Sequence, residues 1–453
     1  MKIAIAHFRV GETDGVSLEM EKWKIVLEKL GHEVIFLAGS KGSTDAYVID
    51  ELHYKHPLND KFVTNAYDEL VDYESPNQLK QAILDFSEVI ERKLIKFIEN
   101  EDIDLLVPNN IWSLGWGLPA GIAFAEAVKK TKTPCIAHHH DFHWERDRYQ
   151  APTDPFITEL LTTYFPPDLP HVRHVVINKI AQQELHERRG IEATVVPNVF
   201  DFSVPSWGID DFNQDFREAI NVGENDLLIL QATRIAERKA IELGIDVVAE
   251  IMQPENRDKL LNKPLPTDGI FTKDSKIVYV LAGLEESTSD YLVGLKQKAE
   301  TRGVDLRLVN ERIEHSREVK DGRKHYALWD AYVHSDYVTY PSILEGWGNQ
   351  LLEAVFAKKP MVVYEYPVYG TDIKSEGFSF VSLGDTHTVT NEGFVEVDHN
   401  LIEEAAKAIV DLLTSPEAYR QVTEDNFTVA KEKYSYEALG TYLAPLFSNA
   451  TVS

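Results

Sequence analysis

The sequence has 453 residues, is 43% hydrophobic and carries a formal net charge of −28 with its histidines counted as neutral. This length exceeds one ordinary hydrophobic core and suits two domains. The excess of negative charge argues against a nucleic-acid partner and against stable membrane association, because it repels nucleic acid and anionic lipid at long range. The one cysteine, Cys135, allows no internal disulfide, and we expect a cytoplasmic location.

The first part of the chain alternates short apolar runs with amphipathic helical patterns. Between the first two runs, the segment SLEMEKWKIVLEKLG has apolar residues at helical spacing, with Gly31 as its C-cap. Continuous apolar strands separated by helices predict a parallel sheet that is covered on both faces. The strands are expected at Ile3–Ala6, Val34–Ala38, Leu105–Pro108, Cys135–His138, His174–Ile177 and Thr194–Val196.

The same pattern restarts after the polar, turn-rich segment PSWGIDDFNQ, which is typical of a linker. We therefore expect an α/β fold with two doubly wound domains that face each other across a cleft. The domains are expected at 1–205 and 206–420, and 421–453 should hold helices that cross back to the first domain. The strands of the second domain are expected at Asp226–Ala232, Lys276–Gly283, Asp305–Asn310, Tyr337–Pro341 and Pro360–Tyr366.

The loop after the first strand reads HFRVGETDGVSLEM and opens into a helix. Gly11 and Gly15 bracket this loop, where they permit close approach of the backbone to a ligand near a helix N-terminus, which attracts anions. A plain tight turn explains the two glycines equally well. The loop lacks the GxGxxG spacing, so a dinucleotide fingerprint is not supported. Arg9, at the end of the strand, is a candidate contact for a bound substrate.

The fourth strand ends in AHHHDFHWERDRY, which leaves three interpretations open. The histidines and Asp141 are metal-ligand types, but neighbouring strand residues point to opposite faces, so few of them can converge. In a second, structural interpretation, one imidazole is buried in the core with its hydrogen bonds satisfied, and the others are solvated. In the third, the loop contacts a polar substrate, with Arg146 and Arg148 near an acidic group.

Two further loops follow strands of the second domain. Arg234 and Lys239 flank a turn before a helix, where two cations suit a diphosphate, although two solvated surface charges would look the same. The segment PSILEGWGNQLLEAVFAKKP places Glu345 in a loop before the expected helix Asn349–Lys358. Glu353 follows about two turns later, near the same side of that helix.

These motifs together resemble the retaining nucleotide-sugar glycosyltransferases with the GT-B fold, the group that includes sucrose-phosphate, trehalose and phosphatidylinositol mannoside synthases. The E-x7-E motif of that family matches Glu345 through Glu353, and its arginine and lysine match Arg234 and Lys239. Gly15 matches the glycine of its first loop. VVPNVFDF resembles the stretch before its interdomain linker, so the resemblance covers nearly the whole chain.

The resemblance implies a role for each matched residue. Arg234 and Lys239 hold the donor diphosphate, Glu353 binds the ribose hydroxyls, and Glu345 faces the transferred sugar. The remaining donor contacts are expected from Gly15, Gly346, Trp347, Gly348 and Asn349. His140 matches the histidine near the reacting face of the sugar, with His139 and His143 as alternatives. Acceptor contacts are expected from Arg9, His143, Arg146 and Arg148.

The resemblance further implies a metal-independent enzyme with no obligatory cofactor, because fixed cations stabilise the leaving diphosphate. The donor is expected to be a UDP-, GDP- or ADP-sugar that gives up glucose or mannose. The acceptor is expected to be a soluble sugar, a sugar phosphate or a glycerate derivative. A sugar-nucleotide 2-epimerase, a glucan phosphorylase and a non-catalytic nucleotide-sugar or polysaccharide-binding protein are the alternatives. The sequence leaves the oligomeric state open.

Overall fold

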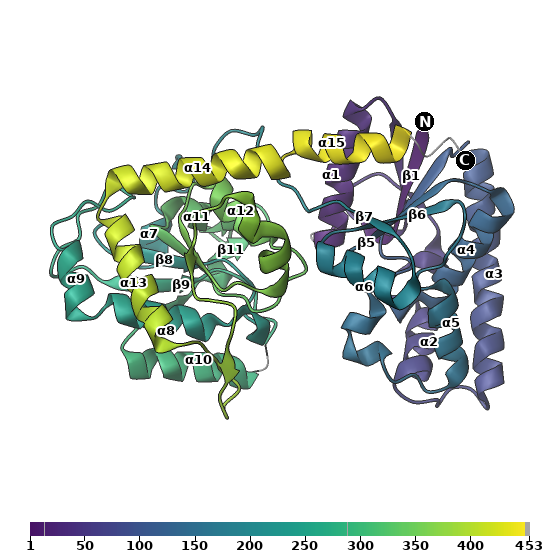
Figure 1. The fold of residues 1–453 in the computed structure, drawn as a ribbon, viewed down its shortest axis with the longest axis horizontal. Helices are drawn as coiled ribbons and strands as arrows, with labels where there is room; N and C mark the ends of the chain where they lie inside the picture. Colours follow the sequence, from purple (N-terminus) through teal and green to yellow (C-terminus); the bar gives the residue numbers. More distant parts are fainter. Residues whose placement is uncertain (13, 288, 449–453) are drawn as a thin grey trace. The chain divides into compact units, whose positions relative to one another are not determined.

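The computed structural model describes residues 1–12, 14–287 and 289–448, and contacts divide the chain into two compact units (Figure 1). The first unit comprises Met1–Val199 together with the chain from Tyr436 onward. The second unit comprises Phe200–Ser435. The domain boundaries expected after residues 205 and 420 stay predictions.

The first unit is built around a parallel sheet in the order β3-β2-β1-β4-β5-β6-β7. Each strand pairs with its neighbour in the parallel sense, as expected for strands that helices connect. The strands are β1 (Lys2–Val10), β2 (Glu33–Lys41), β3 (Tyr47–Val48), β4 (Leu105–Pro108), β5 (Cys135–His139), β6 (Val172–Val176) and β7 (Ala193–Val195).

Helices cover both faces of this sheet. Asp14 caps the first of them, because its side chain accepts hydrogen bonds from the backbone N–H groups of Val16 and Ser17. The last helix packs on the first, with Leu439 and Leu443 in the same core as Trp23. The helices are α1 (Gly15–Lys29), α2 (Pro57–Tyr67), α3 (Pro76–Asn100), α4 (Leu118–Thr131), α5 (Pro155–Tyr164), α6 (Lys179–Arg189) and α15 (Tyr436–Ser448).

The second unit repeats this architecture around a parallel sheet in the order β10-β9-β8-β14-β15-β16. Its strands are β8 (Leu227–Gln231), β9 (Ile277–Leu281), β10 (Asp305–Leu308), β14 (Tyr337–Tyr340), β15 (Met361–Val363) and β16 (Val381–Ser382). Its helices are α7 (Phe216–Ala219), α8 (Ile241–Ile251), α9 (Pro254–Leu260), α10 (Ser289–Arg302), α11 (Leu328–His334), α12 (Asn349–Phe356), α13 (His399–Leu413) and α14 (Pro416–Tyr434).

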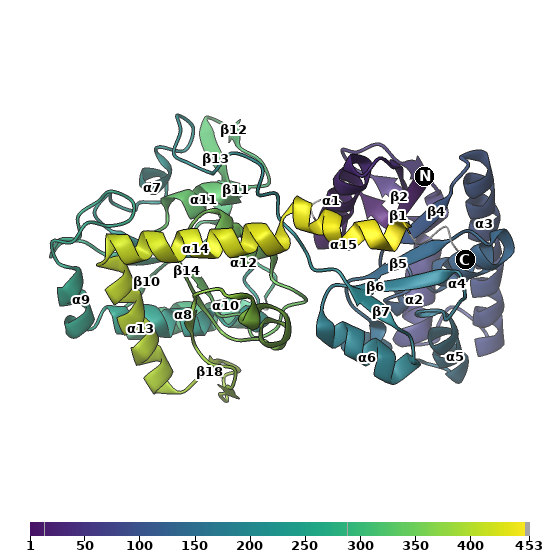
Figure 2. The same cartoon turned by 45° about the horizontal axis from the view of Figure 1, so that its top comes forward.

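Two small sheets accompany the main sheet of the second unit. The strands β11 (Ile313–Glu314), β12 (Glu318–Lys320) and β13 (Arg323–Ala327) form one of them, and Figure 2 shows this sheet beside α11. The strands β17 (Thr388–Val389) and β18 (Val395–Glu396) form the other. The sequence predicted none of these strands, because runs of two to five residues are too short to show a period.

The strand orders fix where each unit can bind a ligand. Within each sheet, with strands counted in chain order, the first strand pairs with the second on one side and with the fourth on the other. These trios are β2-β1-β4 in the first unit and β9-β8-β14 in the second. Ligands of open α/β sheets bind outside the carboxyl ends of the strands at this reversal. The loops after β1 and β4, and those after β8 and β14, are therefore the places to look for a site.

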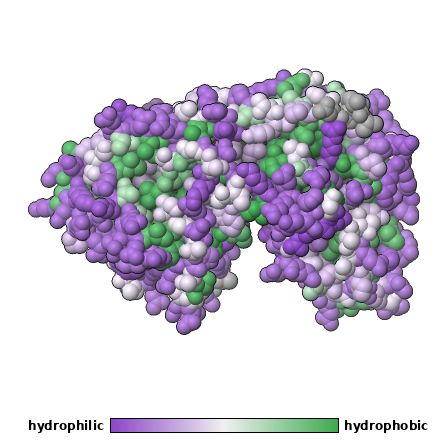
Figure 3. Space-filling view, in the orientation of Figure 1, coloured by the Kyte–Doolittle hydropathy of each residue, from purple (hydrophilic) through white to green (hydrophobic). Residues whose placement is uncertain are grey.

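The surface is strongly hydrophilic, as the acidic composition requires. Hydrophilic residues cover most of the visible face of each unit, and hydrophobic ones appear there in small patches (Figure 3). Among the described residues, no helix combines the length and the apolar character needed to cross a bilayer.

Candidate active site

The loop after β8 holds a buried lysine. A short 3-10 helix, Glu237–Lys239, carries Lys239 just before α8 begins at Ile241. Lys239 is only 4% exposed, and its ammonium group donates a hydrogen bond to the carboxylate of Glu345. Burial lowers the pKa of Lys239, while the attraction of Glu345 raises it. Two residues that sequence reasoning placed on separate loops are therefore one ion pair.

The loop that carries Glu345 joins β14 to α12 and is fixed by close packing. Gly348 has a φ of +135°, and a Cβ atom there would lie 2.4 Å from the hydroxyl oxygen of Tyr366. That hydroxyl donates a hydrogen bond of 2.6 Å to the carbonyl of Trp347. The indole ring of Trp347 is buried and packs edge-on against Tyr434. Gly348 is thus required by both conformation and space.

Two polar side chains of this loop are buried without a protein partner among the described residues. They are the hydroxyl of Ser342, which is fully buried, and the indole N–H of Trp347. Buried polar groups in folded proteins nearly always have a hydrogen-bond partner, so exceptions often mark a place that a ligand or a water fills. Both exceptions lie within three residues of Glu345, next to the buried ion pair.

Arg234 and a residue that sequence reasoning missed share one acidic partner. The guanidinium of Arg234 pairs with one carboxylate oxygen of Glu286, and that of Arg238 lies 3.5 Å from the other oxygen. Glu286 follows β9, the strand next to β8. The run ERK gave a signal for Arg238, which directly precedes Lys239. Glu286 had no signal, because only the strand order brings its loop to that of Arg234.

Glu353, the second carboxylate of the motif, lies on α12 as expected. It accepts a hydrogen bond of 3.1 Å from the hydroxyl of Tyr332, which is a residue of α11. Tyr332 is 1% exposed, and burial, followed by the nearby charge of Glu353, raises the pKa of its hydroxyl. The buried phenol therefore stays protonated and can hold the carboxylate in one orientation.

Two histidines of β5 are held by contacts within the first unit. His139 is buried at the end of β5, with one ring nitrogen 2.7 Å from the hydroxyl of Ser113 and the other 3.0 Å from His174. His138 lies on the opposite face, where it contacts the side-chain oxygen of Asn109 at 2.8 Å and stacks on Trp23. Both are buried in the core, whereas the structural interpretation of the loop expects one buried imidazole and the others solvated.

His140 differs from these two because it follows the strand and is only partly buried as a residue. Its Nε2 atom is nevertheless buried and has no protein partner among the described residues. Burial, and then the neighbouring His7, lower the pKa of His140 to about 3. The imidazole is therefore neutral near pH 7 and able to accept or donate one hydrogen bond.

Each arginine expected to contact an acceptor is paired with a carboxylate of its own unit. Arg9 lies 3.2 Å from Glu12, and it also contacts Asp14, the cap of α1. Arg146 contacts Asp141 through its Nε atom at 3.1 Å, and Arg148 contacts Asp68 at 2.8 Å. His143 opens the 3-10 helix His143–Glu145, and burial lowers its pKa to about 4.

The first loop contains one glycine that the backbone requires. Gly11 has a φ of +69°, and a Cβ atom there would lie 2.8 Å from the backbone nitrogen of Thr44. Gly15, which the resemblance singled out, is the first residue of α1, and a Cβ atom there would meet nothing within 4 Å. The space beside Gly15 is thus open.

Two other features were tested as alternatives. No group of three or more potential ligands for a metal ion occurs among residues 1–12, 14–287 and 289–448.

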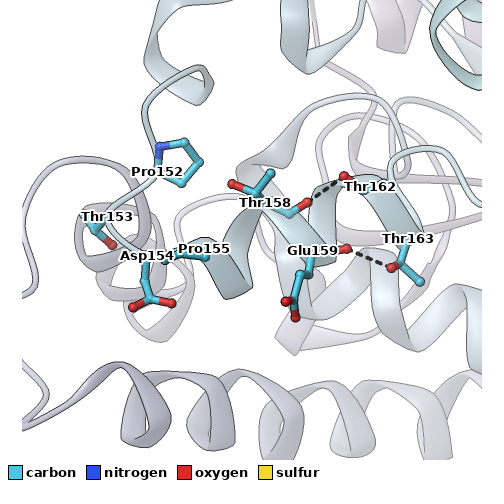
Figure 4. Close-up of a pocket in the computed structure, with 8 residues that line it drawn as sticks. All are labelled: Pro152, Thr153, Asp154, Pro155, Thr158, Glu159, Thr162 and Thr163. Atoms are coloured by element: carbon cyan, nitrogen blue, oxygen red, sulfur yellow. Dashed lines mark hydrogen bonds between the residues drawn. The ribbon is translucent and has the colours of Figure 1, made fainter.

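A surface hollow over α5 contains none of the candidate residues, and the hydroxyls of Thr162 and Thr163 there bond to carbonyls of their own helix (Figure 4). It is lined by Pro152, Thr153, Asp154, Pro155, Thr158, Glu159, Thr162 and Thr163.

Comparison with known proteins places the chain in a family. Residues 212–428 match the family described as glycosyl transferases group 1. The mannosylglucosylglycerate synthase of Thermotoga maritima is 41% identical over 450 residues, which cover 98% of this chain and 99% of that protein. The chain belongs to the group 1 glycosyltransferases. The predicted enzyme class, a hexosyltransferase of that family, is confirmed.

Two more comparisons agree with the assignment of this chain to the group 1 glycosyltransferases. The mannosylglucosylglycerate synthase of Petrotoga mobilis is 39% identical over 434 residues, which cover 95% of this chain and 97% of that protein. The solved structure of sucrose-phosphate synthase from Thermosynechococcus elongatus has a TM-score of 0.58 and 15% identity, and the match covers 99% of this chain and 98% of that one. The predicted GT-B fold, with two Rossmann-like parallel sheets, is confirmed.

Proposed function

We propose that the enzyme transfers a mannosyl group from a nucleotide-diphosphate mannose to a glucosylglycerate, with retention of configuration at the anomeric carbon. The observation that carries the proposal is the identity of 41% over nearly the full length of a mannosylglucosylglycerate synthase. The match covers 98% of this chain, so it extends over both units.

The second unit is proposed to bind the donor. Transfer from a sugar nucleotide develops negative charge on the leaving diphosphate, and preorganised cations stabilise this charge more than they stabilise the ground state. Arg234 and Lys239, both on the loop after β8, are proposed to supply these cations. Lys239 is already held in place by Glu345, so little reorganisation is needed when charge develops. This arrangement requires no divalent metal ion.

The remaining donor contacts follow from the geometry of the loop and of α12. Glu353, oriented by Tyr332, is proposed to accept hydrogen bonds from the ribose hydroxyls. Glu345 is proposed to face the transferred sugar. The backbone N–H groups from Gly346 to Asn349 are proposed to bind its hydroxyls and the phosphate, and the side chain of Ser342 is a further unpartnered donor beside them.

The first unit is proposed to bind the acceptor and to supply His140. A neutral imidazole with an unpartnered Nε2 can hold a sugar hydroxyl without repelling the positive charge that develops at the anomeric carbon. Arg9, His143, Arg146 and Arg148 are the proposed acceptor contacts, and an arginine can bind the glycerate carboxylate in a bidentate manner. Gly15, also in the first unit, is a proposed donor contact, and the space beside it is open.

A donor screen followed by an acceptor screen tests this function. The full-length enzyme is titrated by calorimetry with GDP, UDP and ADP, and the mannose derivative of the best binder is then supplied with glucosylglycerate, glycerate, glucose or glucose phosphate. We expect one nucleotide diphosphate to bind and glucosylglycerate to be the preferred acceptor. Equal turnover with all four acceptors would refute the acceptor assignment, and failure of all three nucleotides to bind would refute the donor assignment.

Substitution of His140 tests the role of the first unit. His140→Ala should lower turnover and leave the affinity for the nucleotide diphosphate unchanged, because the side chains proposed to hold the diphosphate and the ribose all lie in the second unit. His139→Ala is the matched control. It should lower the stability of the first unit, since it removes two buried hydrogen bonds. Unchanged turnover of His140→Ala would transfer the role to His143.

A further inference from the structure

The carboxylate of Glu286 forms ion pairs with both exposed guanidinium groups of the loop after β8. One of its oxygens pairs with Arg234 and the other lies 3.5 Å from Arg238. Main-chain contacts hold the two loops together, because the N–H of Glu286 donates to the carbonyl of Ile235 at 2.9 Å. The N–H of Ile235 in turn donates to the carbonyl of Leu284 at 2.8 Å. The acidic side chain is thus placed beside the arginines by the fold itself.

We propose that Glu286 is a displaceable counter-ion that tunes the affinity of the site for the donor diphosphate. In the free enzyme its carboxylate competes for Arg234 and Arg238, and a ligand with two phosphoryl groups displaces it, whereas a ligand with one does not. The inference rests on the proposed function, because the donor diphosphate is the ligand that takes the two guanidinium groups.

The two ion-pair systems of the site differ in how easily they open. The side chains of Lys239 and Glu345 are 5% and 11% exposed, so this pair is shielded from water. The side chains of Arg234, Arg238 and Glu286 are 49%, 45% and 35% exposed. Exposed ion pairs stabilise a protein only weakly, so a multiply charged ligand can replace Glu286. The exposed arginines are therefore the exchangeable part of the site.

The number of phosphoryl groups decides whether displacement occurs. A single phosphoryl group can bind beside Lys239 at the start of α8 and leave the Glu286 pairs intact. A second phosphoryl group then reaches the guanidinium groups, where bidentate contacts with Arg234 and Arg238 replace the carboxylate contacts. The diphosphate therefore loses part of its binding free energy to the broken Glu286 pairs, a cost that a monophosphate does not incur.

Glu286→Gln tests the proposal, because it keeps the size of the side chain and removes its charge. Calorimetry measures the dissociation constants of GDP and GMP, UDP and UMP, ADP and AMP, inorganic pyrophosphate and inorganic phosphate. The affinity for diphosphates should rise by about 3- to 30-fold, which corresponds to two exposed ion pairs. The affinity for monophosphates should rise less, so the ratio between the two classes increases. Glu285→Gln, at the neighbouring exposed position, should change neither.

The outcomes separate this inference from the proposed function. A salt titration should shrink the difference between the variant and the parent, because screening weakens charge competition. Weaker diphosphate binding by Glu286→Gln, or an unchanged ratio between the two classes, would overturn the competing role and show that Glu286 only positions Arg234. If the parent enzyme binds none of the diphosphates, the donor assignment fails instead.

Discussion

Replacing Lys239 with Met should lower the free energy of unfolding of the second unit and also reduce turnover, for two separable reasons. The Lys239–Glu345 pair is nearly buried, with side chains 5% and 11% exposed. Removing one partner of a buried pair leaves an uncompensated charge, which costs about 3–5 kcal/mol. We expect the lower end of this range, because Glu345 keeps some contact with water. Loss of one preorganised charge should separately reduce turnover by about a hundred- to a thousandfold.

The double variant Lys239→Met/Glu345→Gln separates the two effects. Removing both charges should restore much of the stability, because no unpaired charge stays buried, but it should not restore turnover. Urea unfolding monitored by circular dichroism measures the free energy of unfolding, and nucleotide release measures turnover.

A second buried pair of the same unit provides the control. Lys298 lies 2.7 Å from Asp246, with side chains 15% and 11% exposed. Lys298→Met should destabilise less than Lys239→Met, because Arg302 remains bound to Asp246 at 3.0 Å, and it should leave turnover near that of the parent. Unchanged stability of Lys239→Met, or a double variant no more stable than both single ones, would refute the reasoning.

Three further predictions follow from the described contacts. Burial lowers the pKa of His140 to about 3 and those of His143 and His174 to about 4. The unfolded chain takes up these protons near pH 6.5 and the folded chain does not, so stability is full above pH 6.5 and falls as the pH decreases. At pH 5 the free energy of unfolding is lower by about 2 kcal/mol per histidine. A midpoint of urea unfolding that stays the same from pH 7 to pH 5 would contradict this prediction. Tyr332→Phe should raise the dissociation constant of the nucleotide diphosphate by about tenfold or less and leave the rate at saturating donor unchanged, since it frees Glu353 from one hydrogen bond. Equal affinity of variant and parent in calorimetry would show that this bond does not orient the carboxylate. Excess EDTA should leave turnover intact, whereas loss of turnover that Mg²⁺ or Mn²⁺ restores would assign the leaving-group charge to a metal ion.

The main strands and the loops that carry the candidate residues could be predicted from the sequence because their signals are local. Buried parallel strands appear as continuous apolar runs, and β8, β9, β14 and β15 lie where such runs were found. The helix expected at Asn349–Lys358 is α12, which ends at Phe356. Alternation along β5 also predicts that His138 and His140 share a face, and their ring centroids lie 4.3 Å apart.

The partners of the site residues could not be predicted, because they come from other loops. Nothing in the sequence near Arg234 indicates that Glu286, 52 positions later, is its partner. The choice between His139 and His140 likewise depends on tertiary contacts. His139 is satisfied by Ser113 and His174, which lie on other segments of the first unit. Local patterns identify the loops, and the strand order decides which loops meet.

Product analysis of the complete reaction tests the proposed function most directly. The enzyme is incubated with the mannose derivative of its preferred nucleotide and with glucosylglycerate, and the products are followed by nuclear magnetic resonance. We expect stoichiometric nucleotide diphosphate and a mannosylglucosylglycerate whose anomeric configuration matches that of the donor. Nucleotide release at the same rate without acceptor, with free mannose or its 2-epimer as the other product, would contradict the assignment as a transferase to glycerate-type acceptors.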